Sequence, residues 1–232
     1  MFSQGRININ VKKVVVYIGV LLVTLSILAI ILENTVYNNS SANLIRVACI
    51  GDSITELPYY PDELQTLLGT NYTVGNFGAG GSTVLLDTGK PYIDQVEFVE
   101  AKNFLPDIAI IMLGTNDART DHYKSIDNFV PDYMKLINEI QALESNPKIF
   151  LVKPPPLFDN EYELKKENLL EGIIPRIEQI ANEEGLLIVD VYAALENHPE
   201  HFWNDGVHPN SEGANVIANT IYEAIILSTE SS

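Results

Sequence analysis

Short runs, most of them apolar, recur along the chain, and five of them predict the strands of a single sheet. The run at residues 107–113 (DIAIIML) is apolar almost throughout, which is typical of a strand that is buried on both faces. The predicted strands cover residues 44–50, 72–77, 107–113, 148–152 and 186–189.

The stretches between these runs predict helices. Residues 125–143 are the clearest case, because their apolar side chains recur on one face at helical spacing. Gly69 is a suitable stop for the helix predicted at 58–68. A bend or break is expected near Gly172 and Pro175 in the longer helix predicted at 162–184. The predicted helices cover residues 58–68, 92–102, 125–143, 162–184, 192–195 and 211–227.

Strands and helices therefore alternate along the chain. This pattern predicts an α/β fold, in which a parallel sheet is covered by helices on both faces. We expect a three-layer α/β/α architecture with a flavodoxin-like, five-stranded sheet in the order 2-1-3-4-5. The carboxyl ends of all strands would then line one edge of the sheet.

The N-terminal region contains nineteen consecutive uncharged residues, 14–32. At about 1.5 Å per residue, a helix of this length covers nearly the whole of a hydrocarbon layer of about 30 Å. Arg6, Lys12 and Lys13 precede it, so the positive-inside rule predicts a transmembrane signal-anchor with a cytoplasmic N-terminus. A cleaved signal peptide, which would leave a secreted domain, is the alternative.

The predicted organisation is a cytoplasmic segment at 1–13, the transmembrane helix at 14–32, a polar tether at 33–43 and one extracytoplasmic domain at 44–228. Three of the 14 basic residues precede the helix, so the remainder carries 11 basic and 31 acidic residues, a net charge of −20. Such a charge disfavours binding to nucleic acid and to anionic membrane surfaces.

Cys49 is the single cysteine, so no intrachain disulfide can form. It falls within the first predicted strand, where it is expected to act as a small buried hydrophobic residue. A metal or redox role is not expected for a lone cysteine.

The most informative polar stretch is Gly51-Asp52-Ser53, which directly follows the first strand. Open α/β sheets place their chemistry at this position, although the three residues taken alone could form a simple turn. Asp205 and His208 lie three residues apart before the last helix. An aspartate with this spacing can orient the histidine, whose other ring nitrogen can then take a proton from Ser53.

Two further loops offer donors for the oxyanion that forms when a serine attacks an ester. The glycine-rich loop after the second strand contains Gly81, whose backbone N–H is available for close approach. Asn116 follows the third strand and offers a side-chain NH2, and the Ser53 N–H is a third candidate donor.

These stretches resemble the four sequence blocks of the SGNH hydrolases, a branch of the GDSL esterase/lipase superfamily. The blocks are Gly51-Asp52-Ser53, residues 76–83 (NFGAGGST), Gly114-Thr115-Asn116-Asp117 and Asp205-Gly206-Val207-His208-Pro209. The resemblance aligns Gly81 with the oxyanion glycine, with Gly78 and Gly80 as alternatives. It also implies the three-layer fold and a reaction without a metal or cofactor. No G-x-S-x-G elbow is present.

Other residues near the blocks are expected to support the site or to contact the substrate. Asp52 and Asp117 are expected to brace loops, and His198 and His201 to lie at the surface or the rim of the site. Tyr92, Phe158, Phe202 and Trp203 are candidates for stacking on a sugar ring, although each could equally belong to the core.

The predicted activity is hydrolysis of a carboxylic ester, most closely that of a carbohydrate O-acetylesterase. A lysophospholipase or acyl-thioesterase acting on lipids is the alternative, and a non-catalytic binding module on the cell surface is a third hypothesis. The expected protein is a monomer that binds a small-molecule or glycan ester, and it contacts the membrane through its N-terminal helix.

Overall fold

The computed structural model describes residues 24, 26–28, 44–57 and 59–230. The chain divides into two compact units, Met1–Asn43 and Leu44–Ser232. Within the described residues, no helix combines the length and apolar character needed to cross a membrane. The predicted transmembrane helix at 14–32 lies outside them except for residues 24 and 26–28, so it stays a prediction, as do the segments at 1–13 and 33–43.

The second unit is built on a five-stranded sheet in which every neighbouring pair is parallel, in the order β2-β1-β3-β4-β5. The predicted α/β class, strand number and strand order are thereby confirmed. The strands are β1 Ile45–Gly51, β2 Tyr72–Gly78, β3 Ile108–Met112, β4 Lys148–Val152 and β5 Leu187–Val189.

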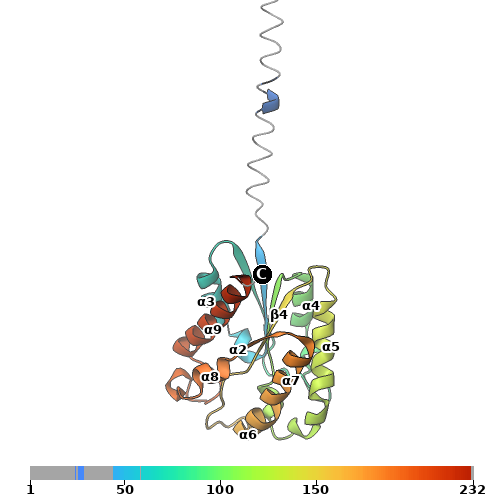
Figure 1. Ribbon diagram of the computed structural model, residues 1–232. Coiled ribbons are helices and arrows are strands. Elements are labelled where there is room, and N and C mark those ends of the chain that lie inside the picture. The colour runs from blue at the N-terminus through green and yellow to red at the C-terminus, as the bar shows by residue number, and fades with distance from the viewer. Residues whose placement is uncertain (1–23, 25, 29–43, 58, 231–232) are drawn as a thin grey trace, which may run out of the picture. The chain divides into compact units, whose positions relative to one another are not determined.

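Helices cover both faces of the sheet (Figure 1). Side chains alternate along a strand, so Ala48 and Ile50 of β1 face one layer while Val47 and Cys49 face the other. The first layer contains α4 (Val96–Asn103), α5 (Phe129–Gln141) and α7 (Ile174–Glu184). The second contains α3 (Tyr59–Leu68), α8 (Val191–Leu195) and α9 (Ser211–Glu230). Cys49 is fully buried in this second core, as predicted, and burial raises the pKa of its thiol to about 12.

The helix predicted at 92–102 is divided into the 3₁₀ helix η1 (Tyr92–Asp94) and α4, and the one predicted at 125–143 consists of the 3₁₀ helix η3 (Tyr123–Asn128) and α5. Two further predicted helices, 58–68 and 162–184, also differ in detail from the observed ones. The first is preceded by an additional short helix, α2 (Ser53–Glu56), that begins at the serine itself. The long helix at 162–184 starts only at α6 (Lys166–Asn168) and passes through a π-helical segment, η4 (Leu169–Ile173), before α7. The bend expected near Gly172 thus coincides with an extra residue in a helical turn, one of the common causes of such bends.

Candidate active site

The sheet register places the loops of the predicted site side by side. Gly51 is paired with Gly78 of β2 and with Met112 of β3, so the carboxyl ends of these three strands are level. A Cβ atom at position 51 would lie 2.1 Å from Thr55 Oγ1 and 2.7 Å from the Met112 carbonyl oxygen. Only glycine therefore allows β1 to turn directly into α2 between its two neighbouring strands.

Ser53 is the first residue of α2, and Asp52 caps that helix. Asp52 Oδ1 accepts the backbone N–H of Ile54 at 3.0 Å, which fixes the turn that presents the serine. Ser53 Oγ lies 2.9 Å from His208 Nε2, although the two residues are 155 positions apart in the chain.

Asp205 holds the opposite side of the same imidazole. Its Oδ2 atom lies 2.7 Å from His208 Nδ1, and its Oδ1 atom accepts the N–H groups of Val207 and His208 at 2.9 and 3.0 Å. Burial alone would raise the pKa of Asp205, but the hydrogen bonds from His208 and Val207 outweigh it and hold that pKa below its usual value. An ionised carboxylate can only accept, so the imidazole proton is placed on Nδ1, and Nε2 is free to accept the Ser53 hydroxyl proton.

Gly81 and Asn116 line the same pocket as Ser53 and His208, a cavity of about 560 Å³. Gly81 has a φ of +74°, a left-handed conformation that favours glycine. Apart from its chain neighbours, no described residue has a heavy atom within 4 Å of the position of its absent Cβ. Of the alternatives, Gly80 also lines the pocket, whereas Gly78 is the last residue of β2.

The Asn116 amide is oriented by its neighbours. Its Nδ2 atom donates to the carbonyl oxygen of Ser82 at 3.0 Å and lies 3.4 Å from Asp52 Oδ2. The glycine-rich loop and the loop after β3 are therefore joined to each other and to the turn that carries Ser53.

Asp52 and Asp117 are buried carboxylates that brace these loops, as expected from the sequence. Asp117 accepts the N–H groups of Val84 and Leu85 at 3.1 and 2.8 Å, which ties the glycine-rich loop to the end of β3. Burial raises the pKa of Asp52 to about 6. Burial, with a further contribution from the charge of Asp52, raises the pKa of Asp117 to about 7.

A chain of hydrogen bonds that the sequence reasoning missed leads to Asn116 from the pocket wall. Asp121 accepts two hydrogen bonds from Arg119, at 2.6 and 2.8 Å, and Arg119 donates to His122 Nε2 at 3.0 Å. Because a guanidinium only donates, the His122 proton is placed on Nδ1, which donates to the Asn116 carbonyl oxygen at 2.9 Å. Arg119 and His122 both line the pocket. The sequence signal for this hydrogen-bond chain was the group of ionisable residues, Arg119, Asp121 and His122, that directly follows the block containing Asn116.

The aromatic side chains near His208 differ from most of those proposed for sugar stacking. Tyr92 is fully buried and Phe202 nearly so, which leaves neither ring open to a sugar, whereas Phe158 is half-buried and packs edge-on against Phe202. Trp203 is 42% exposed, with its ring 6.4 Å from that of His208. Two exposed tyrosines were missed. Tyr162 contacts the His208 ring edge-on at 6.1 Å, and Tyr59 contacts Trp203 in the same way at 6.0 Å.

Comparison with known proteins identifies a family to which the chain belongs. Residues 49–216 match the GDSL-like lipase/acylhydrolase family. The chain is 33% identical over 206 residues to an acetylxylan esterase of Xylanibacter ruminicola, a match that covers 78% of this chain and 43% of that protein. It is 26% identical over 148 residues to a multidomain esterase of Ruminococcus flavefaciens, covering 62% of this chain and 18% of that protein. The chain thus spans less than half the length of these curated relatives.

Solved structures share the fold. A carbohydrate acetylesterase from Sinorhizobium meliloti matches with a TM-score of 0.63 and 20% identity, over 78% of this chain and 98% of that one. A carbohydrate esterase family 3 protein from Talaromyces cellulolyticus matches with a TM-score of 0.60 and 22% identity, over 81% and 99%. At these identities the likeness establishes the three-layer fold.

Proposed function

Because the chain belongs to the GDSL-like lipase/acylhydrolase family, a family of ester-bond hydrolases, we propose that it cleaves carboxylic esters with Ser53 as nucleophile. Membership confirms the resemblance inferred from the four sequence blocks. The observation that carries the proposed mechanism is the hydrogen-bonded series from Ser53 Oγ through His208 to Asp205, at 2.9 and 2.7 Å.

In the first half-reaction, Ser53 Oγ attacks the ester carbonyl while His208 Nε2 takes the hydroxyl proton. The oxyanion receives hydrogen bonds from the N–H groups of Ser53 and Gly81, each worth about 3 kcal/mol of barrier. Asn116 Nδ2 is the third donor: it keeps its hydrogen bond to Ser82 and exchanges its long contact with Asp52 Oδ2 for the oxyanion. His208 then gives its proton to the departing alcohol as the carbon–oxygen bond breaks. Water, deprotonated by the same nitrogen, attacks the acyl-enzyme. The bond to Oγ then breaks, His208 Nε2 returns the proton to Oγ, and the carboxylic acid leaves. Asp205 orients the imidazole throughout.

The substrate that we propose is an O-acetylated carbohydrate. The pocket wall supports this assignment, because Arg119, Glu161 and Glu163 offer charged groups that can hydrogen-bond sugar hydroxyls. The exposed rings of Trp203 and Tyr162 beside His208 offer faces for stacking on a sugar. The acetylxylan esterase relative supports the same substrate class by its name.

The wall of the pocket fits a lipid substrate less well. A long acyl chain requires a continuous apolar groove, whereas the aliphatic side chains among the described pocket residues are those of Leu164 and Val207. A non-catalytic binding module would not need the Asp205–His208–Ser53 arrangement. Attachment through residues 14–32, with the domain outside the cytoplasm, stays a prediction that suits a polysaccharide substrate. Membrane fractionation of the full-length chain tests it.

The proposed activity is tested with the purified full-length chain and p-nitrophenyl acetate. Ser53→Ala should lower turnover by roughly 10⁴-fold or more. Ser211→Ala removes an exposed hydroxyl at the start of α9 and should leave turnover unchanged. No turnover by the unmutated protein, or full turnover by Ser53→Ala, would overturn the enzyme assignment. Release of acetate from acetylated xylan, together with slower cleavage of the octanoyl ester, is expected, and a preference for the octanoyl ester would favour the lipid alternative.

A further inference from the structure

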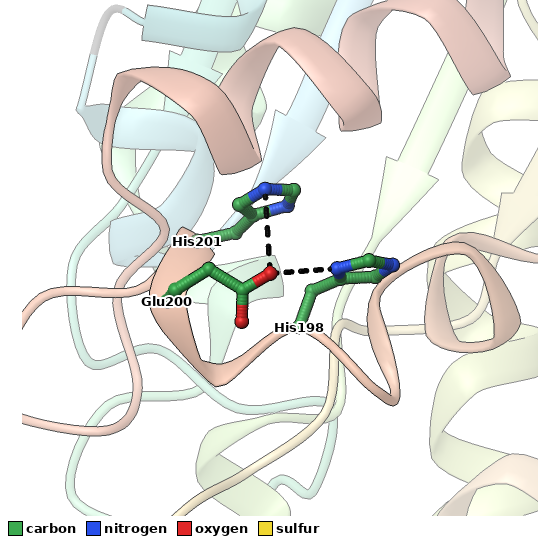
Figure 2. A group of neighbouring side chains, drawn as sticks. All are labelled: His198, Glu200 and His201. Atoms are coloured by element: carbon green, nitrogen blue, oxygen red, sulfur yellow. Dashed lines mark hydrogen bonds and ion pairs between the residues drawn. The ribbon is translucent and has the colours of Figure 1, made fainter.

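A second group of chemically active side chains lies at the short 3₁₀ helix η5 (Pro199–His201) and on the residue before it, His198, outside the pocket of Ser53. Figure 2 shows the rings of His198 and His201 both facing the carboxylate of Glu200. His198 is exposed, as expected from the sequence, whereas His201 is partly covered. Neither histidine lines the catalytic pocket.

The possible ligand atoms of the three side chains lie close together. Glu200 Oε1 lies 2.8 Å from His198 Nδ1 and 3.8 Å from His201 Nε2, and no pair of the three atoms is more than 4.8 Å apart. The imidazole rings are stacked, with 4.7 Å between their centroids and 9° between their planes. Ligand atoms around a tetrahedral zinc ion are about 3.4 Å apart, given bond lengths near 2.1 Å. The observed separations bracket this value. Because an ion lies in the plane of each imidazole that binds it, one of the two rings must also turn out of the stack for both nitrogens to point at the same ion.

The backbone of the turn is already fixed. His201 N–H donates to the His198 carbonyl oxygen at 3.0 Å. Asn210 donates its backbone N–H to the His201 carbonyl oxygen at 2.9 Å and its side-chain NH2 to the Glu200 backbone carbonyl oxygen at 2.8 Å. Binding therefore requires ordering of side chains alone, which lowers its entropic cost.

His201 presents Nε2 to Glu200, whereas its Nδ1 is buried and has no hydrogen-bond partner among the described residues. Coordination of an ion by Nε2 therefore places the ring proton on Nδ1, where none of these residues accepts it, which lowers the affinity of the site. Solvent reaches the other two ligands, since the side chains of His198 and Glu200 are 47% and 63% exposed. Water can therefore complete the coordination of a bound ion.

We propose that His198, Glu200 and His201 bind one divalent transition-metal ion of the zinc class, through two imidazole nitrogens and a carboxylate oxygen. Imidazole ligands favour such ions over calcium and magnesium, which prefer oxygen ligands. The site is separate from the esterase reaction and has a structural role. It joins the two sides of a turn that continues into the Phe202–Pro209 bridge and the hydrogen bond from Trp203 N–H to the His208 carbonyl oxygen.

The test is titration of Zn²⁺ into the full-length protein without a polyhistidine tag, after treatment with a chelator, followed by calorimetry. One ion should bind per chain. Glu200→Gln and His201→Ala should each weaken binding by at least roughly tenfold, since even the loss of an outer-shell partner has such an effect. Glu196→Gln is the matched control, because it neutralises an exposed carboxylate just before the turn and should leave the affinity unchanged.

Melting temperature provides a second measurement. Zinc should raise it in the unmutated protein and in Glu196→Gln, but not in Glu200→Gln or His201→Ala. The three altered side chains lie at or near the surface, so circular dichroism without metal should match in all variants. The absence of saturable binding would overturn the proposal, as would equal affinity in Glu200→Gln and the unmutated protein.

Discussion

Replacing Asp205 by asparagine tests how the catalytic imidazole is held, because the substitution can preserve two hydrogen bonds and reverse the third. Asp205 Oδ1 accepts the N–H groups of Val207 and His208, and Oδ2 accepts His208 Nδ1–H. An asparagine that keeps its oxygen on the two backbone donors must turn its NH2 group toward Nδ1. The ring proton then moves to Nε2, where the ring can no longer accept the proton of Ser53.

The expected magnitude follows from this exchange. Loss of the productive tautomer lowers kcat by about 10⁴-fold, which is about 5.5 kcal/mol of barrier. Stability should fall by only about 1 kcal/mol, because a charge-assisted hydrogen bond is replaced by a neutral one. Asp205→Ala leaves all three donors without their acceptor. It should lower kcat as much as Asp205→Asn does, but it should lower the free energy of unfolding by more, about 1–3 kcal/mol.

The assay measures initial rates with p-nitrophenyl acetate and free energies of unfolding in urea for both variants. We expect the two variants to lose the same amount of rate, whereas Asp205→Ala loses more stability than Asp205→Asn. A rate for Asp205→Asn within tenfold of the unmutated protein would refute the argument. A comparable stability loss in both variants would show that asparagine does not keep the two backbone hydrogen bonds.

Further predictions concern the donors, the buried carboxylates and metal removal. Asn116→Ala should lower kcat by about 10²–10³-fold, with little change in the substrate concentration at half-maximal rate, and an unchanged kcat would remove Asn116 from the oxyanion site. His122→Ala should lower kcat by up to about 10²-fold, because His122 positions Asn116 through its carbonyl oxygen, and a change confined to substrate binding would contradict this role. The raised pKa values of Asp52 and Asp117, about 6 and 7, mean that the folded state binds protons more tightly than the unfolded state. Their contribution to stability is therefore full below pH 4 and is lost as pH rises to about 7. The free energy of unfolding in urea should fall with pH over this window, and it should fall less steeply in Asp117→Asn. Exhaustive treatment with EDTA should leave turnover of p-nitrophenyl acetate unchanged, and activity that is lost and then restored by zinc would refute a metal-free reaction.

The fold was predictable because its strands are short apolar runs with a clear alternation of helices between them. The site followed from the same reasoning, since Ser53, Gly81 and Asn116 each come after a predicted strand. Once the sheet is parallel, these residues must share an edge, and the structure brings them to one pocket.

The errors arise where particular side-chain contacts overrule the periodic pattern. The helix predicted from residue 162 starts later because the side chain of Asn160 organises a loop, accepting the N–H groups of Tyr162 and Leu164. Periodicity carries no information about such a side-chain cap. Tyr92 was a candidate for stacking, but its hydroxyl donates to the Phe77 carbonyl oxygen inside the core. Whether an aromatic ring is exposed depends on tertiary packing, which the sequence pattern does not specify.

The placement of Asp205 and His208 on one loop determines at which stage of folding the site can become active. This acid–base pair is local and can form as soon as its own loop does, whereas its distance to the nucleophile depends on the docking of α9 against α3. During synthesis the serine emerges from the ribosome long before its base, so the nascent chain stays inert until its last segment has folded. In the finished protein, transient undocking of that C-terminal segment would switch off catalysis while most of the sheet stays intact, and amide exchange in α9 should track the inactive fraction.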